Sequence, residues 1–259
     1  MTFIKTNLSY FLVIFCLLCH ITGSTQANRF SYNAYTNTNG DTLKYRQLFP
    51  DNDPSQKYPL VIFLHGSGER GNDNEAQLKW GITNFATDDM MSKHPAFVIA
   101  PQCPLNMSWS NFVKEGSGTN MLLQQVPTKP MALLIALISQ LKKTLPVDTN
   151  RIYITGLSMG GFGTLDIIQR YPHLFAAAVP VCGGGDASKA ASIAHIPIWL
   201  FHGANDPSVN PQYTLDMVNA LTKAGSHVGF TQYPQVGHFS WLAAYSDALM
   251  IEWLFKQHQ

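Results

Sequence analysis

Hydrophobic and polar positions divide this chain into segments that alternate between strand and helix patterns. Short, almost continuous apolar runs are typical of buried parallel strands, and apolar residues spaced three or four apart are typical of helices. The apolar runs cover residues 59–64, 96–100, 151–155, 176–181, 196–201 and 228–233. Helical spacing covers residues 75–86, 130–145, 160–171, 211–224 and 241–257. This alternation predicts a mostly parallel sheet with helices on both faces.

Two more strands are expected near the start of this domain. Residues 30–36 and 42–49 alternate between apolar and polar side chains, and Asn39-Gly40 between them is a strong signal for a hairpin turn. With the six later strands they make a doubly wound α/β sheet of about eight strands. Ligands bind such sheets at the carboxyl ends of the strands, so the residues directly after each strand are the candidates for chemistry.

The first 27 residues have a different pattern. Lys5 precedes an almost unbroken apolar run from Leu8 to Cys19. Thr25 and Ala27 then place small side chains at positions −3 and −1 of a cleavage site after residue 27. This is the layout of a secretory signal peptide, and about 12 apolar residues are fewer than the roughly 20 that a membrane-spanning helix needs. We therefore expect a signal peptide at residues 1–27, a single domain at residues 28–259, and a secreted or periplasmic protein without stable membrane insertion. An uncleaved anchor is the alternative.

Composition narrows the classes of partner. The chain has 259 residues, of which 46% are hydrophobic and 13% charged, as expected for one sizeable globular core. Lys5 is the only Lys, Arg, Asp or Glu in the first 27 residues, which leaves 16 of the 17 basic side chains to balance the 16 acidic ones. Without net charge or a basic stripe, neither nucleic acid nor an anionic membrane surface is an expected partner. No Cys/His cluster has zinc spacing and no loop resembles a calcium site, so we expect no metal and no cofactor.

The strand at residues 151–155 leads into Gly156-Leu157-Ser158-Met159-Gly160, and a helical pattern follows. Glycines suit a sharp strand-to-helix turn, because bulkier neighbours would prevent the close passage that leaves the serine exposed. A serine hydroxyl becomes a nucleophile when a histidine takes its proton and a carboxylate orients that histidine. Asp206 and His238 each follow a predicted strand, so all three side chains are expected at one edge of the sheet.

This order and the glycine turn resemble the α/β-hydrolase fold. The stretches LHGSGERGNDN, APQCP, DTNRIYITGLSMGGFGT, VCGGGD, HGANDP and GHFSW are similar to a bacterial esterase/peptidase group, over residues 40–256. That group is related to polyhydroxybutyrate-depolymerase-like, feruloyl-esterase-like and phospholipase/carboxylesterase families. The resemblance implies a serine carboxylic ester hydrolase with Ser158 as nucleophile, His238 as base and Asp206 as acid. It also implies an oxyanion hole formed by the backbone N–H groups of Ser67 and Met159.

Several residues compete for these roles or have two interpretations. Asp186 also follows a strand and is the alternative acid. His65 and His202 follow strands too, but we expect each to hydrogen-bond backbone and shape a turn. We interpret Asp166 as a surface charge on the helix after Ser158.

Other residues near the expected site concern substrate binding. Glu69 and Arg70 are interpreted as an ion pair that fixes a loop, with recognition of a substrate carboxylate as the alternative. Trp109 and Trp241 are candidates for the wall of the substrate pocket, with ordinary packing as the alternative. Residues 106–127 are expected to cover the site and to set the size of the substrate.

Cys103 and Cys182 lie in a chain that is expected to be exported, where disulfides form. Their strands would be separated by two others, which places them roughly 14 Å apart at about 4.8 Å per strand spacing. A disulfide needs Cα atoms within about 7 Å, so we predict two free, buried thiols. Cys182 is also a weak alternative nucleophile.

The expected activity is hydrolysis of a carboxylic ester through an acyl-enzyme. The substrate is either a small ester or an acyl, feruloyl or acetyl ester linked to a carbohydrate. A peptidase of the prolyl-oligopeptidase kind, an acyltransferase and an inactive binding module on the same fold remain alternatives.

Overall fold

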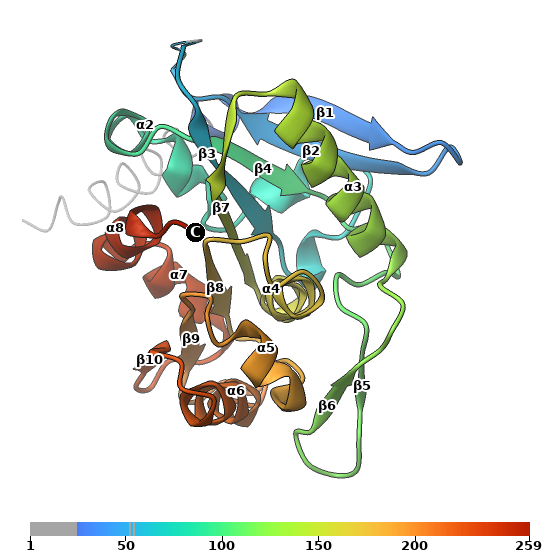
Figure 1. Ribbon diagram of the computed structural model, residues 1–259, viewed down its shortest axis with the longest axis vertical. Coiled ribbons are helices and arrows are strands. Elements are labelled where there is room, and N and C mark those ends of the chain that lie inside the picture. Colours follow the sequence, from blue (N-terminus) through green and yellow to red (C-terminus); the bar gives the residue numbers. More distant parts are fainter. Residues whose placement is uncertain (1–24, 52, 54) are drawn as a thin grey trace, which may run out of the picture.

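The computed structural model describes residues 25–51, 53 and 55–259. Figure 1 shows one twisted sheet crossing the molecule, with helices on both of its faces. The predicted signal peptide lies outside the described residues except for its last three. In the part of the chain that the structure describes, no helix has the length and apolar character needed to cross a membrane.

The main sheet lies in the strand order β1-β2-β4-β3-β7-β8-β9-β10. Its strands are β1 (Ser31–Thr36), β2 (Thr42–Leu48), β3 (Tyr58–Leu64), β4 (Phe97–Pro101), β7 (Val147–Leu157), β8 (Ala177–Val181), β9 (Trp199–Gly203) and β10 (Gly229–Tyr233). β2 pairs antiparallel with β1 and with β4, and the neighbours from β4 to β10 pair in parallel. The predicted sheet of about eight mostly parallel strands is confirmed.

Alternating side chains of the strands build one hydrophobic core on each face of the sheet. In β3, Leu60, Ile62 and Leu64 point to one core, while Val61 and Phe63 point to the other. The first core is covered by α3 (Lys129–Thr144), α4 (Met159–Arg170), α5 (Ala190–Ile193) and α6 (Gln212–Lys223). The second is covered by α7 (Trp241–Ala244) and α8 (Ala248–Lys256), with α2 (Asp88–Lys93) beside them.

Two predicted helices differ from the structure. Residues 75–86 form two separate 3₁₀ turns, η2 (Ala76–Leu78) and η3 (Ile82–Ala86), because Gly81 between them has a φ of +73° and packs against Tyr245. The predicted helix over residues 241–257 is divided into α7 and α8. The Asp247 side chain starts α8 by accepting a hydrogen bond from the Leu249 N–H at 2.9 Å.

Residues 106–127 contain a hairpin of β5 (Phe112–Lys114) and β6 (Met121–Leu123), which stands apart from the main sheet (Figure 1). Its base is tied to α4. Asp166 accepts the Asn111 N–H at 2.9 Å and pairs with Arg170 at 2.6 Å, and Arg170 donates to the Gln125 carbonyl at 3.0 Å. The interpretation of Asp166 as a surface charge is therefore wrong. The carboxylate is buried, which raises its pKa although Arg170 and Asn111 favour the charged form.

Cys103 and Cys182 are both free and buried, as predicted. Their strands, β4 and β8, are separated by β3 and β7. The sheet order therefore keeps the two thiols apart.

The turn from β7 to α4 packs tightly against the end of β3. Ser158 lies between the two elements with a φ of +53°. A Cβ atom added to Gly156 would lie 2.5 Å from the Gly160 carbonyl oxygen, and one added to Gly160 would overlap the Leu64 carbonyl oxygen. No side chain fits at either position without moving backbone, so both glycines are required by the close approach.

We expect Gly160→Ala to destabilise the protein by at least about 2 kcal/mol, since backbone that cannot move aside easily is forced apart. Gly118→Ala is the matched control, because a Cβ there meets nothing within 4 Å. Chemical denaturation of the two variants and the parent measures the difference in unfolding free energy. Equal stability of the Gly160 and Gly118 variants would contradict the packing described for the turn.

Candidate active site

Ser158 is held at the carboxyl end of β7 by its own backbone. Its N–H donates to the Val181 carbonyl at 2.9 Å, and its carbonyl accepts the Phe162 N–H at 3.0 Å in the first turn of α4. A non-glycine residue at positive φ is strained by roughly 1–3 kcal/mol and persists only where the surroundings impose it. Here those two hydrogen bonds and the glycine contacts impose it, and they present the hydroxyl at the edge of the sheet.

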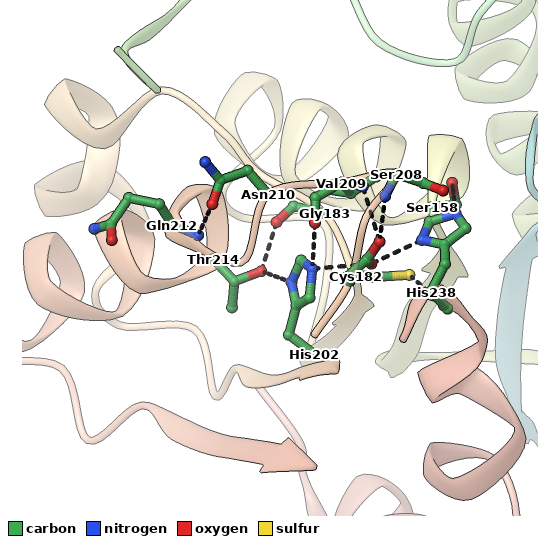
Figure 2. Close-up of polar contacts among 11 residues, drawn as sticks. Ser158, Cys182, Gly183, His202, Ser208, Val209, Asn210, Gln212, Thr214 and His238 are labelled. Atoms are coloured by element: carbon green, nitrogen blue, oxygen red, sulfur yellow. Dashed lines mark hydrogen bonds and ion pairs between the residues drawn. The ribbon is translucent and has the colours of Figure 1, made fainter. Parts of the chain in front are cut away.

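The structure brings Ser158, His238 and Asp206 together in one hydrogen-bonded chain. His238 Nε2 lies 3.0 Å from Ser158 Oγ, and His238 Nδ1 lies 2.7 Å from Asp206 Oδ2. Figure 2 shows His238 reaching Ser158 from a different segment of the chain, the turn after β10. A carboxylate only accepts hydrogen bonds, so the imidazole proton lies on Nδ1 and Nε2 is free to take a proton from the serine.

Asp206 has two more donors at its other oxygen. The N–H groups of Ser208 and Val209 lie 2.8 and 2.9 Å from Oδ1. Burial opposes ionisation of this carboxyl, but the hydrogen bonds from Val209, His238 and Ser208 together hold its pKa below the usual range. The acid is therefore ionised and fixed in orientation at neutral pH.

Asp186, the alternative acid, does not bind His238 and has other partners. Its Oδ1 accepts the Ser188 N–H at 2.9 Å and starts η4 (Ala187–Lys189), and its Oδ2 accepts the Leu123 N–H at 3.0 Å. It therefore ties the β5–β6 hairpin to the core, and the histidine at the site pairs with Asp206 instead.

The two other histidines after strands have different surroundings. His65 shapes a turn as expected: Nδ1 donates to the Gly66 carbonyl at 2.6 Å, Nε2 accepts the Cys103 N–H at 2.9 Å, and burial lowers its pKa to about 4. His202 also contacts backbone, but its Nε2 lies 3.2 Å from Asp206 Oδ2 as well. Sequence reasoning missed this second imidazole on the acid.

Ser67 and Met159 occupy adjacent places at the strand ends. β3 and β7 are neighbours in register, with Leu64 opposite Gly156, so the turn after β3 runs beside the turn that carries Ser158. Ser67 opens η1 (Ser67–Glu69), and Met159 opens α4. Within the described part of the chain, neither N–H has a hydrogen-bond acceptor. Both groups are free to bind an anionic oxygen.

The prediction that Trp109 lines the substrate pocket is wrong. Its ring is fully buried, and Nε1 donates to the His65 carbonyl at 3.2 Å. Trp241 is also buried, with its ring packed edge-on against His238 at 5.0 Å between centroids. It supports the histidine from behind, which was the alternative interpretation.

Two aromatic residues that sequence reasoning missed lie nearer the surface. Phe239 is 55% exposed, and Trp80 is half-buried with its ring 5.8 Å from that of Phe239. Both rings pack on Trp241, which itself packs on His238. Phe239 directly follows the histidine, and this adjacency was the available signal. Together these rings give the site an apolar border.

Glu69 and Arg70 do not form the expected ion pair with each other in the described part of the chain. Glu69 is buried and accepts the Trp80 Nε1–H at 3.0 Å. Arg70 Nε lies 3.2 Å from the sulfur of Met159. The loop after β3 is thus fixed, as expected, but through an indole and a thioether.

Among the described residues, one group of metal-binding side chains is compact enough to hold an ion: Cys182, Asp206 and His238. Asp206 and His238 already bind one another, and burial raises the pKa of the Cys182 thiol to about 12. A metal needs the thiolate, so these residues do not fit a metal site. The same protonation makes Cys182 a poor nucleophile.

Comparison with known proteins agrees with this arrangement. Residues 50–250 match the model of the phospholipase/carboxylesterase family. The chain is 28% identical to poly(3-hydroxyalkanoate) depolymerase C of Paucimonas lemoignei, over 77% of this chain and 52% of that protein. It is 26% identical to a bifunctional acetylxylan esterase/xylanase of Neocallimastix patriciarum, over 60% of this chain and 20% of that protein.

The chain thus spans at most about half the length of these two relatives. A crystal structure of a thermostable esterase is 40% identical, with a TM-score of 0.84, over 91% of this chain and 64% of that one. The resemblance to esterases of the α/β-hydrolase fold, noted from the sequence motifs, is confirmed. The chain belongs to the phospholipase/carboxylesterase family.

Proposed function

We propose that this protein hydrolyses carboxylic esters through an acyl-enzyme on Ser158. The observation that carries the proposal is the continuous chain of hydrogen bonds from Ser158 through His238 to an ionised, buried Asp206. Each link has the geometry that proton transfer from a serine hydroxyl requires. The family and the esterase similar to this chain support the same reaction class.

In the proposed reaction, Ser158 Oγ attacks the ester carbonyl while its proton moves to His238 Nε2. Asp206 stabilises the imidazolium that results. The oxyanion of the tetrahedral intermediate accepts hydrogen bonds from the N–H groups of Ser67 and Met159, at the positive end of α4. His238 then protonates the leaving alcohol. In the second half, His238 takes a proton from the water that attacks the acyl carbonyl. It then gives this proton to Ser158 Oγ as the acyl–oxygen bond breaks, which releases the carboxylic acid and restores the serine.

For the substrate, we propose acyl esters of carbohydrates, such as acetyl or feruloyl esters. A groove of about 700 Å³ runs from the loop of Asp206 to the β5–β6 hairpin. Its lining includes hydroxyl and amide side chains suited to sugar hydroxyls, together with one aromatic ring: Ser117, Thr119, Ser208, Asn210, Gln212 and Tyr213. The acetylxylan esterase activity in the name of one relative supports this class. Such substrates lie outside cells, which agrees with the export expected from residues 1–27.

Ser158→Ala is expected to lower kcat for an ester substrate by about a thousandfold or more, because the acyl-enzyme cannot form. Steady-state hydrolysis of p-nitrophenyl acetate measures the loss, and thermal unfolding of the variant shows that the fold is retained. Hydrolysis within about tenfold of the parent rate would rule out Ser158 as the nucleophile.

Shortening the β5–β6 hairpin tests the proposed substrate class. Replacing residues 115–120 with Asn-Gly keeps the pairing of Lys114 with Met121 and removes one wall of the groove. We expect kcat/KM for an acetylated or feruloylated oligosaccharide to fall about tenfold or more, with little change for p-nitrophenyl acetate. A peptide amide and an acceptor sugar in the same panel test the peptidase and acyltransferase alternatives. An equal loss on both esters would contradict a role of the groove in sugar binding.

A further inference from the structure

His202 lies next to the acid of the site but on its far side from His238. It stands in β9 with its ring fully buried, and Figure 2 shows it between Thr214 of α6 and the loop of Val209. Three residues separate it from Asp206, and the chain bends after Gly203 so that both side chains meet. The ring therefore contacts Asp206, and Asp206 in turn binds His238.

The surroundings of Nε2 determine where a proton of this ring lies. Nε2 is 3.0 Å from the Val209 carbonyl and 3.2 Å from Asp206 Oδ2. Both atoms accept hydrogen bonds and neither donates, since Asp206 is ionised. An unprotonated Nε2 would place three lone pairs against one another in a buried site. Nε2 must therefore carry hydrogen.

The other ring nitrogen has an adaptable partner. Nδ1 lies 2.7 Å from Thr214 Oγ1, and this hydroxyl also lies 2.6 Å from the Gly183 carbonyl. The hydroxyl has one hydrogen, which it donates either to the Gly183 carbonyl while accepting from Nδ1–H, or to Nδ1 when that nitrogen is bare. Burial lowers the pKa of His202, which favours the neutral ring with its single proton on Nε2.

We propose that His202 is a positioning residue of the triad. Its Nε2–H donates to the Val209 carbonyl and so fixes the loop whose N–H binds Asp206 Oδ1, and the same Nε2 lies 3.2 Å from Oδ2, on the side opposite His238. Oδ2 then accepts the Nδ1–H of His238 and lies beside Nε2 of His202, while Oδ1 accepts the backbone N–H groups of Ser208 and Val209. The inference goes beyond the proposed function and rests on it only for the role of Asp206 as the acid.

The buried position of the carboxylate makes this donor hard to replace. The Asp206 side chain has no exposed surface, so in the parent protein its oxygens depend on protein donors and not on bulk water. The ring is itself fixed by Thr214 at the start of α6 and, through it, by Gly183 after β8. His202 thereby couples the orientation of the acid to the packing of α6.

Two substitutions test the roles of the two ring nitrogens separately. The amide nitrogen of His202→Gln reaches the position of Nε2, whereas that of His202→Asn reaches only the position of Nδ1. We expect H202N to lower kcat roughly ten- to a hundredfold with KM changed less than about twofold, because the donor to the Val209 carbonyl, which also lies beside the charged carboxylate, is lost. H202Q should recover most of this loss. The rate constant for reaction of Ser158 with a fluorophosphonate should fall in H202N and recover in H202Q by similar factors. This reaction does not depend on binding of the ester substrate.

Equal kcat and equal phosphonylation rates in H202N and the parent would overturn the proposal, as would an H202Q variant that is no better than H202N. Thermal unfolding of both variants shows whether they fold. NMR of parent protein labelled with ¹⁵N in its histidines tests the proposal independently of the variants, because it reports whether His202 Nε2 carries hydrogen. An unprotonated Nε2 would contradict the proposal. A parent protein that neither reacts with the probe nor cleaves esters would instead refute the proposed function.

Discussion

The close packing of one turn against β3 is the constraint on which the rest of the site depends. Gly156 and Gly160 let the backbone around Ser158 approach the Leu64 carbonyl more closely than any side chain allows. This approach forces Ser158 to positive φ and starts α4 directly behind it. It also sets the loop that carries Ser67 beside the serine. The proposed nucleophile and the groups proposed to bind the oxyanion are therefore positioned by a single packing contact.

Buried carboxylates serve two different purposes around this contact. Asp166 and Asp186 each accept a backbone N–H near one strand of the β5–β6 hairpin, so they hold a surface segment in place. Asp206 accepts three hydrogen bonds, has His202 Nε2 at 3.2 Å, and orients a histidine whose other nitrogen lies at Ser158 Oγ. The residue type is the same in each case. Its partners decide whether the negative charge stabilises structure or an imidazolium.

Sequence patterns predicted the features that depend on strand order and failed for those that depend on loop packing. Ser158 and His238 were predictable because each lies in the turn after a strand, and parallel strands end at one edge. The depth of Trp109 and the burial of Asp166 were not, because both depend on how residues 106–127 pack onto the domain, and the strands of that segment span only three residues each. The contact of His202 with the acid depends on how the chain bends after β9, which no periodicity reveals.

The most direct test of the account is to locate the reactive side chain chemically. Protein inactivated with a fluorophosphonate would be digested and its peptides analysed by mass spectrometry. The account predicts one adduct per chain, on Ser158, and none when Ser158 is alanine. An adduct on Cys182 or Ser67, or an intact protein that takes up no probe, would contradict it.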